Sequence, residues 1–106
     1  MIVISAKLKV LLPEEGGKRI TGIKTGYRPN HVFELTDDKP NSTFIGEILF
    51  DDTEFIYPGE EKIVKIRFIK ESDVENYLYS GRKWWVYEMP NLIARGEVLE
   101  IFQDRK

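Results

Sequence analysis

The stretch IVISAKLKVLL, residues 2–12, carries the clearest pattern in the chain. Apolar residues occupy every second position, and Ser5, Lys7 and Lys9 lie between them. Successive side chains of a strand point to opposite faces, so this period of two predicts a β-strand with one buried face. Half-buried strands of this kind are typical of antiparallel sheets. The residues predicted to point inward are Ile2, Ile4, Ala6, Leu8, Val10 and Leu12.

The same alternation recurs along the rest of the chain. It covers residues 44–50, 83–88 and 92–102, and it places Val64, Ile66 and Phe68 opposite Lys65 and Arg67. We count six or seven strands in a chain of 106 residues, which is the length of one domain. Closure into a barrel removes the exposed edges of such a sheet. The prediction is an all-β fold, a single antiparallel six-stranded β-barrel spanning residues 1–106.

Turn signals separate these strands. The segment PEEGGKR, residues 13–19, predicts a loop, and Tyr57-Pro58-Gly59-Glu60 predicts a type I or type II turn with proline second and glycine third. The segment KESDVENYLYSG, residues 70–81, has room for one helical turn that Ser72 is placed to cap.

Charge is unevenly spread, although the net charge is only −2. Residues 1–30 sum to +4, residues 31–61 to −8 and residues 62–106 to +2. A basic patch or an acidic patch of this kind steers partners, but an ordinary mixed surface fits the pattern as well. The N-terminal residues lack the features of a signal peptide, and lysines interrupt them, so we expect no membrane segment and a cytoplasmic location.

Sequence motifs for common enzyme chemistry are missing. The chain has neither G-x-x-x-x-G-K-[ST] nor G-x-G-x-x-G, so no nucleotide is expected. With one histidine, no cysteine and no serine beside a base, we expect a non-enzymatic protein without metal or other cofactor. His31 is expected at the barrel rim, and the pairs Asp37-Asp38 and Asp51-Asp52 are expected in turns rather than around Ca²⁺.

The pair Trp84-Trp85 lies in a predicted strand, so its two rings must point to opposite faces. One ring then enters the core and the other lies outside. With Tyr87 on the Trp85 face, an exposed aromatic pair would form a stacking or docking surface. The alternative is that a loop, for which residues 70–82 are the candidate, covers it.

Four ordered blocks of the chain resemble the third, C-terminal β-barrel domain of bacterial elongation factor Tu, along nearly its whole length. EGGKR at residues 15–19 resembles the loop after the first strand. GYRP at 26–29, with Phe33 and Thr36-Asp37, resembles G-Y-R-P-x-x-x-F-x-x-T-D. PGE at 58–60 with IVKI at 63–66 resembles a turn and strand, and residues 81–96 resemble the closing hairpin, with Glu88 and Gly96 in matching places. The resemblance implies that domain's barrel fold.

The resemblance also implies where partners bind. In the family this domain packs beside a second barrel, contacts the acceptor and T-stem backbone of aminoacyl-tRNA, and meets the nucleotide-exchange factor. The arginine of G-Y-R-P lies at the tRNA surface, so Arg28 inherits that role, and Glu88 inherits a lesser one. Pro29 fixes the backbone beside Arg28, whose guanidinium suits phosphate. The alternative is that Tyr27 packs and Arg28 bonds a carboxylate of the barrel.

The departures from the family matter as well. The 106 residues hold no counterpart of the GTPase domain or second barrel, and Met89-Pro90 stands where the family has a glycine pair. The link from Ile69 to Gly81 is longer than in the family. Met89-Pro90 suits an apolar docking edge better than a loop facing phosphate. The residues expected to form the partner surface are Tyr27, Arg28, Trp85, Glu88, Met89 and Pro90.

Two functions follow from these residues. The first is a non-enzymatic binding module for a translation-related partner, with protein favoured over tRNA because the acidic middle segment repels RNA. The alternative is a decoy or immunity-type protein that binds a toxin targeting elongation factor Tu. An RNA binder should gather the cations of residues 1–30 on one face, whereas a decoy should expose an apolar patch around one Trp, Met89 and Pro90. The cations of residues 1–30 are Lys7, Lys9, Lys18, Arg19, Lys24 and Arg28. The identity of the partner and the oligomeric state stay open.

Overall fold

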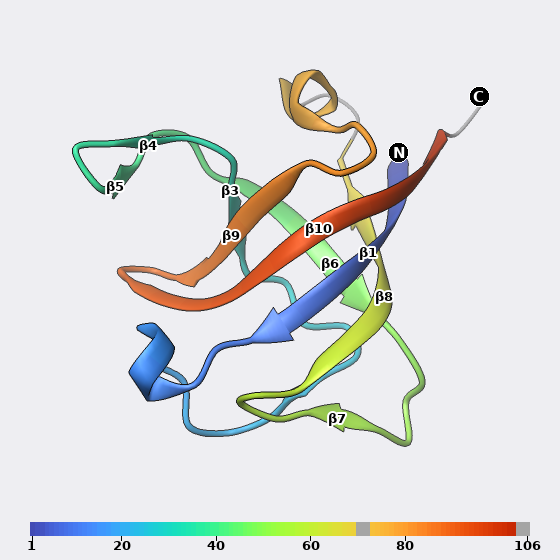
Figure 1. Ribbon diagram of the computed structural model, residues 1–106. Helices are drawn as coiled ribbons and strands as arrows, with labels where there is room; N and C mark the ends of the chain where they lie inside the picture. The colour runs from blue at the N-terminus through green and yellow to red at the C-terminus, as the bar shows by residue number, and fades with distance from the viewer. Residues whose placement is uncertain (70–72, 104–106) are drawn as a thin grey trace.

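Six strands form a closed antiparallel barrel in the computed structural model, which describes residues 1–69 and 73–103 (Figure 1). Around the barrel they follow the order β1-β10-β9-β3-β6-β8, and β8 pairs back onto β1. The predicted six-stranded antiparallel β-barrel is thereby confirmed. Its strands are β1 (Ile2–Val10), β3 (Asn30–Val32), β6 (Phe44–Leu49), β8 (Glu61–Phe68), β9 (Lys83–Glu88) and β10 (Asn91–Gln103).

The inner face of β1 is the one that the alternation predicts, except at its end. Ile2, Ile4, Ala6, Leu8 and Val10 are all buried. The prediction for Leu12 is wrong, because the strand ends at Val10 and a short 3-10 helix, η1 (Pro13–Glu15), follows. Leu11 is the buried residue there, and Leu12 remains partly exposed.

The inward and outward faces of β8 are confirmed. Val64, Ile66 and Phe68 are buried, while Lys65 and Arg67 are exposed. The ring of Phe68 packs edge-on against His31, with 5.1 Å between ring centres.

The turn before β8 has the geometry that its sequence predicts. The amide of Glu60 donates to the carbonyl of Tyr57 over 2.9 Å, which closes the turn. Gly59 has φ of 92°, and a positive φ at the third position distinguishes type II from type I. Proline and glycine therefore set the turn type locally.

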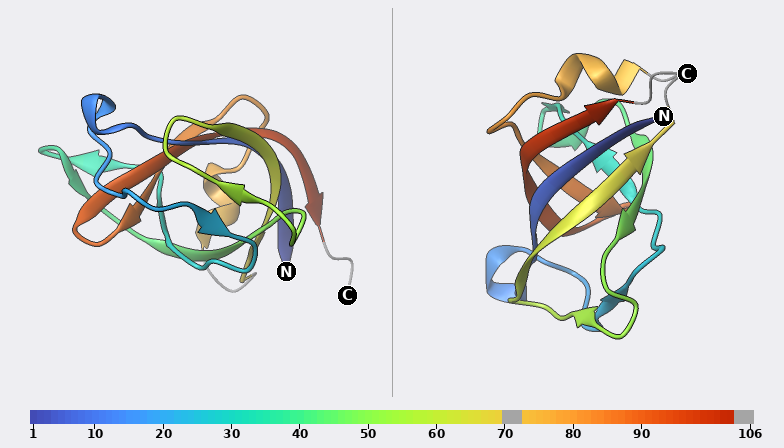
Figure 2. Two further views of the ribbon diagram at one scale, coloured as in Figure 1. Left: turned by 90° about the horizontal axis from the view of Figure 1, so that it is seen from below. Right: turned by 90° about the vertical axis from the view of Figure 1, so that its right-hand side faces the viewer.

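Short elements close both ends of the barrel (Figure 2). At one end β2 (Ile23–Lys24) pairs with β7 (Phe55–Ile56), and the paired residues Ile23 and Ile56 are both buried. At the other end the predicted helical turn is the 3-10 helix η2 (Asp73–Tyr77), whose Tyr77 stacks on Phe33 with ring centres 5.4 Å apart. The proposed cap Ser72 lies outside the described residues. None of the described helices is long and apolar enough to span a membrane.

A small hairpin extends from the side of the barrel. Strands β4 (Leu35–Thr36) and β5 (Lys39–Pro40) pair across Asp37 and Asp38, which both have positive φ. Two consecutive residues of positive φ are the mark of a type I′ hairpin turn, which aspartate tolerates. The structure therefore shows these two aspartates in the turn-forming role expected of them.

Candidate partner-binding surface

The segment Gly26–Pro29 lies along β6. The amide of Gly26 donates to the carbonyl of Ile48, and the amide of Ile48 donates to the carbonyl of Tyr27, both over 2.8 Å. Gly26 adopts φ of 93°, which lets the chain turn into this pairing. The GYRP segment is thus a structural turn fixed to the barrel wall, from which Tyr27 and Arg28 reach different partners.

Tyr27 and Glu88 meet in a polar cluster that also contains Arg19. The hydroxyl of Tyr27 and the guanidinium of Arg19 both donate to the Glu88 carboxylate. Arg19 also lies over the Tyr27 ring, 5.1 Å from its centre, and donates to the carbonyls of Thr21 and Gly22 over 3.0 Å each. We call Arg19, Tyr27 and Glu88 the clamp. It ties the loop before β2 and the GYRP segment to the β9–β10 hairpin.

The electrostatics of the clamp keep Tyr27 protonated. Burial and the hydrogen bond to Glu88 raise the pKa of the Tyr27 hydroxyl above its ordinary value, and Arg19 opposes this only in part. A protonated hydroxyl donates and a carboxylate accepts, so the clamp is complete without any ligand. Glu88 therefore has a structural role whether or not a partner also contacts it.

Met89 and Pro90 form the tip of the hairpin beyond the clamp. Glu88 pairs with Asn91 across the turn, so the tip consists of only these two residues. Met89 is 44% exposed and Pro90 is also exposed. An apolar tip on a hydrogen-bonded base is a site that a partner can cover at small entropic cost.

Arg28 is not part of the clamp. Its guanidinium lies 3.6 Å from the carboxylate of Glu47 on β6, which Arg67 of β8 also binds over 2.5 Å. Hydrogen bonding by Arg67 and then the charge of Arg28 hold the pKa of Glu47 below its ordinary value. The structure shows the predicted alternative, in which Arg28 bonds a barrel carboxylate. The side chain nevertheless stays 64% exposed.

Trp84 is the inward ring of the tryptophan pair, and it meets His31 in the core. The Trp84 indole N–H donates to Nδ1 of His31 over 3.0 Å, and Nε2 of His31 lies 2.9 Å from the carbonyl of Gly46. These contacts fit a neutral imidazole protonated on Nε2. The expectation that His31 lies at the rim is wrong, because the ring is fully buried. Burial lowers its pKa to about 4.

Trp85 points outward and is partly exposed, but the predicted aromatic pair does not form. Tyr87 is buried, so it adds no ring to an exposed surface. Within residues 73–82, Tyr77 and Arg82 contact Phe33 at the end of the barrel. Trp85 is therefore the one aromatic side chain that β9 leaves partly exposed on the outside of the barrel.

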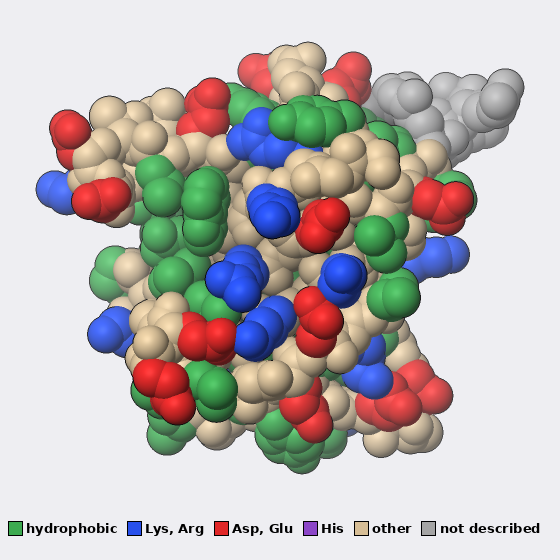
Figure 3. Space-filling model, viewed as in Figure 1, with side chains coloured by type: hydrophobic (Ala, Val, Ile, Leu, Met, Phe, Trp, Pro, Cys, Tyr) green, Lys and Arg blue, Asp and Glu red, His purple; other side chains and the backbone are tan. Residues whose placement is uncertain are grey.

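The surroundings of Trp85 are set by strand register. One cross-strand row across β8, β1, β10 and β9 consists of Glu61, Lys9, Arg95 and Trp85. The neighbouring row consists of Ile63, Lys7, Glu97 and Lys83. Between them lies a depression of about 410 Å³, which we call the basic hollow. Four cations and two carboxylates line it together with Trp84, Trp85 and Gly96. The charged residues are Lys7, Lys9, Lys83, Arg95, Glu61 and Glu97. Figure 3 shows cations with interspersed carboxylates over this face.

The cations of the basic hollow are only partly neutralised. Lys9 pairs with Glu15 over 2.6 Å. Within residues 1–69 and 73–103, no ion pair involves Lys7, Lys83 or Arg95. Lys83 and Arg95 do not belong to the basic N-terminal segment. Only the pairing of β10 with β1 and β9 shows that they join Lys7 and Lys9.

The six cations of residues 1–30 do not share one environment. Lys7 and Lys9 line the basic hollow, Arg19 belongs to the clamp, and Arg28 lies beside Glu47. Lys24 lies over the ring of Phe55 at one end of the barrel, with its nitrogen 5.9 Å from the ring centre. The single basic face expected of an RNA binder is therefore not made from these residues.

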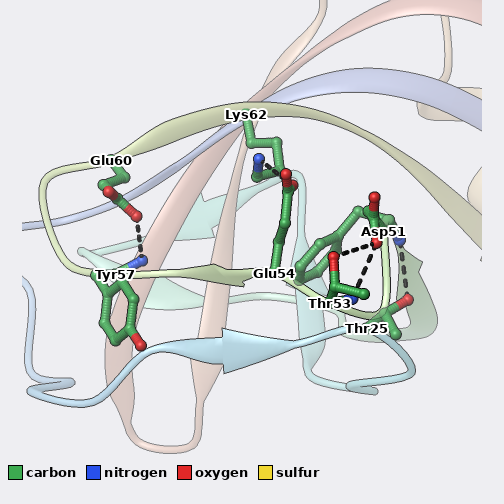
Figure 4. A network of polar contacts seen from close by, with 8 residues as sticks. Thr25, Asp51, Thr53, Glu54, Tyr57, Glu60 and Lys62 are labelled. Carbon is green, nitrogen blue, oxygen red and sulfur yellow. Dashed lines mark hydrogen bonds and ion pairs between the residues drawn. The ribbon is translucent and has the colours of Figure 1, made fainter.

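Three of the five acidic residues of segment 51–61, namely Asp51, Glu54 and Glu60, have local structural roles (Figure 4). Asp51 accepts from the amide and hydroxyl of Thr53 over 2.9 and 2.8 Å, which holds the pKa of Asp51 below its ordinary value. Glu60 accepts from the amide of Tyr57 over 2.9 Å, and Glu54 pairs with Lys62. These contacts agree with the turn-forming role that the sequence predicts for Asp51.

No protein-family model matches the chain. The structure brings Tyr27 and Glu88 into contact beneath Met89 and Pro90, and it places Arg28 in a separate ion-pair cluster. Sequence reasoning did not identify Arg19, Lys83 or Arg95 as neighbours of the candidate residues, because their contacts depend on which strands lie side by side.

Proposed function

We propose that the chain is a non-enzymatic binding module that engages a translation-related protein through the hairpin tip. The observation that carries the proposal is the apolar tip of Met89 and Pro90 on the clamp of Arg19, Tyr27 and Glu88. The resemblance of residues 15–19, 26–37 and 81–96 to the elongation factor Tu barrel supports a partner from translation.

The charges at the tip favour a protein over RNA. The clamp pairs the cation of Arg19 with the carboxylate of Glu88, so it leaves little net positive charge beneath the tip. Phosphate binding needs cations that can release counterions, whereas apolar side chains in a dry centre give protein interfaces much of their affinity. Met89 has the flexible apolar side chain that adapts to a protein surface.

A tRNA partner is the second candidate, and the basic hollow is the observation that favours it. Lys7, Lys83 and Arg95 lie around a partly exposed Trp85, and arginine or lysine beside an aromatic ring suits phosphate and base. Because Glu61 and Glu97 line the same depression, we expect RNA binding there to be weak and sensitive to salt.

Affinity capture from native lysate, with and without RNase, tests the proposal. Wild type should retain a protein partner in both arms, and Met89→Asp should lose it because the new charge is buried at the contact. Ile63→Asp is the matched control, since Ile63 is an exposed apolar residue on β8 away from the tip. Equal capture by wild type and Met89→Asp would contradict the proposal.

Filter binding of aminoacyl-tRNA at low and moderate salt tests the second candidate. If tRNA binds, its affinity should fall as salt rises, and the slope of log affinity against log salt concentration reports the phosphates that are neutralised. Each of Arg95→Gln and Arg28→Ala should reduce this slope by about one unit if the wild-type side chain contacts a phosphate. Lys65→Gln, on β8 beside Phe102, is the control cation. Tight, salt-dependent binding would replace protein by tRNA as the partner, and no binding at low salt would remove tRNA.

A decoy for a toxin that targets elongation factor Tu would use the same apolar tip. The captured protein separates the two roles. A component or regulator of translation supports the binding module, and a toxin that also binds the elongation factor, in competition with this chain, supports the decoy.

A further inference from the structure

An exposed aromatic pair lies at the barrel end formed by β2 and β7, far along the chain from the hairpin tip. Phe55 and Tyr57 flank the buried Ile56, so both point out of the same side of the strand. Their rings stack with centres 5.8 Å apart and an angle of 27°. Phe55 is 43% exposed and Tyr57 is 52% exposed. Large rings that stay exposed together are typical of docking surfaces.

The pair is held in place by the protein. Gly22 lies so close to it that a Cβ there would be 2.8 Å from the Tyr57 ring and 3.3 Å from Cβ of Phe55. The hydrogen bond from the Tyr57 amide to Glu60 fixes the strand end (Figure 4). Rings that are already ordered lose little conformational entropy when a partner covers them.

Acidic residues outnumber cations around the two rings, although Lys24 lies over Phe55. The segment DDTEFIYPGEE, residues 51–61, contains five acidic residues and no lysine or arginine. Glu54, Glu60 and Glu61 line an open depression of about 450 Å³ with Phe55 and Tyr57, and Lys62 is the only cation among its six lining residues. Lys62 already pairs with Glu54. Glu61 has no ion-pair partner among the described residues.

We infer that this aromatic and acidic surface, which we call the β7 ledge, binds a protein segment rich in lysine and arginine. A cation over an aromatic ring within about 6 Å is attracted by the ring's negative face. Lys24 already takes this position over Phe55, at 5.9 Å, so this ring attracts a cation within the chain, and a partner's cation would use the ring of Tyr57 or displace Lys24. A long basic side chain would lay its aliphatic part on Tyr57 and its charged end against Glu60 and Glu61.

Charge complementarity selects this occupant over others. Nucleic acid and acidic protein segments would be repelled by the carboxylates. A purely apolar segment would contact the rings but would gain no attraction from the carboxylates beside them. The inference does not depend on the hairpin tip, because the two surfaces share no residue.

Titration with a labelled peptide of alternating arginine and glycine tests the ledge, and the same peptide with glutamate in place of arginine is the control ligand. Binding is measured by fluorescence anisotropy at low and moderate salt, and the site by shifts of backbone amide resonances. We expect the arginine peptide to bind, to weaken as salt rises, and to shift residues 55–61. Failure to bind at low salt, equal binding of the glutamate peptide, or shifts confined to other segments would overturn the inference.

Leucine substitutions separate a docking role from a folding role, because leucine keeps apolar bulk and removes the ring. Tyr57→Leu and Phe55→Leu should each weaken arginine-peptide binding by about threefold or more, as should Glu61→Gln. Phe102→Leu is the matched control, since Phe102 is 44% exposed with Lys65 over its ring at 5.2 Å. Unchanged affinity in both leucine variants, with melting temperatures equal to wild type, would refute the ledge. Met89→Asp should leave peptide binding intact even if the tip proposal fails.

Discussion

Acidification below about pH 7 should destabilise the fold through His31. The imidazole is fully buried between Trp84, Phe68 and the carbonyl of Gly46, and burial lowers its pKa to about 4. Protonation would put a charge in the core and remove the lone pair that accepts from Trp84. The unfolded chain has no such restriction and binds a proton near the ordinary pKa of about 6.5.

The sign and size follow from that difference. As pH falls below about 6.5, the unfolded state takes up a proton that the folded state does not, so the free energy of unfolding falls. The loss continues until about pH 4, where the folded imidazole also titrates, and above about pH 7 it is absent. Between about pH 7 and pH 5 we expect a loss of about 2 kcal/mol, and about 3 kcal/mol in all.

Urea denaturation across this pH range measures the loss, and nuclear magnetic resonance assigns it. The chain has one histidine, so its imidazole Cε1 proton signal is unambiguous. Hydrogen bonds hold the pKa values of Glu15, Glu47 and Asp51 below their ordinary values, so these groups stay ionised above about pH 5. A folded-state imidazole that titrates near pH 6.5, with stability flat from pH 7 to pH 5, would refute the reasoning.

Further predictions concern the core, the clamp and nucleotides. Phe68→Ala should lower the free energy of unfolding by about 3–5 kcal/mol in urea, and a loss below about 1 kcal/mol would contradict its inward position. Gly96→Ala places a Cβ 2.6 Å from the Trp84 ring, so it should cost about 1–3 kcal/mol; an unchanged midpoint would show that the strand yields freely. Tyr27→Phe removes the donor to Glu88 and should cost about 1 kcal/mol, measured the same way. Titration calorimetry with GTP and ATP in Mg²⁺ should show no binding, and micromolar affinity for either would overturn the motif argument.

The candidate site was predicted less completely than the fold. Tyr27, Glu88, Met89 and Pro90 do lie together, but Arg28 pairs with Glu47 instead of joining them. Side-chain neighbours of this kind come from residues far apart in the chain: Tyr27 and Glu88 are 61 positions apart. No local pattern encodes such a distance, because it depends on the register of strands that meet only when the barrel closes.

Tryptophan and histidine show the same limit within the core. Alternation requires that one of Trp84 and Trp85 point inward, yet it does not say which, since either choice preserves the period of two. The structure selects Trp84, whose indole finds His31 as acceptor across 53 positions of sequence. A buried polar group needs a partner, so the same contact takes His31 away from the rim and into the core.

The sequence by itself predicted the inner faces of β1 as far as Val10 and of β8, the turns, and an all-β barrel. Period-two alternation, the Pro58-Gly59 turn and the aspartate pair at 37–38 act over a few residues, so they can be read without knowing the fold. Only the tertiary structure decided which surfaces result. Register across β8, β1, β10 and β9 assembles the basic hollow, and pairing of β7 with β2 exposes Phe55 and Tyr57. Binding surfaces need side chains from several strands, and their proximity exists only once those strands are hydrogen-bonded side by side.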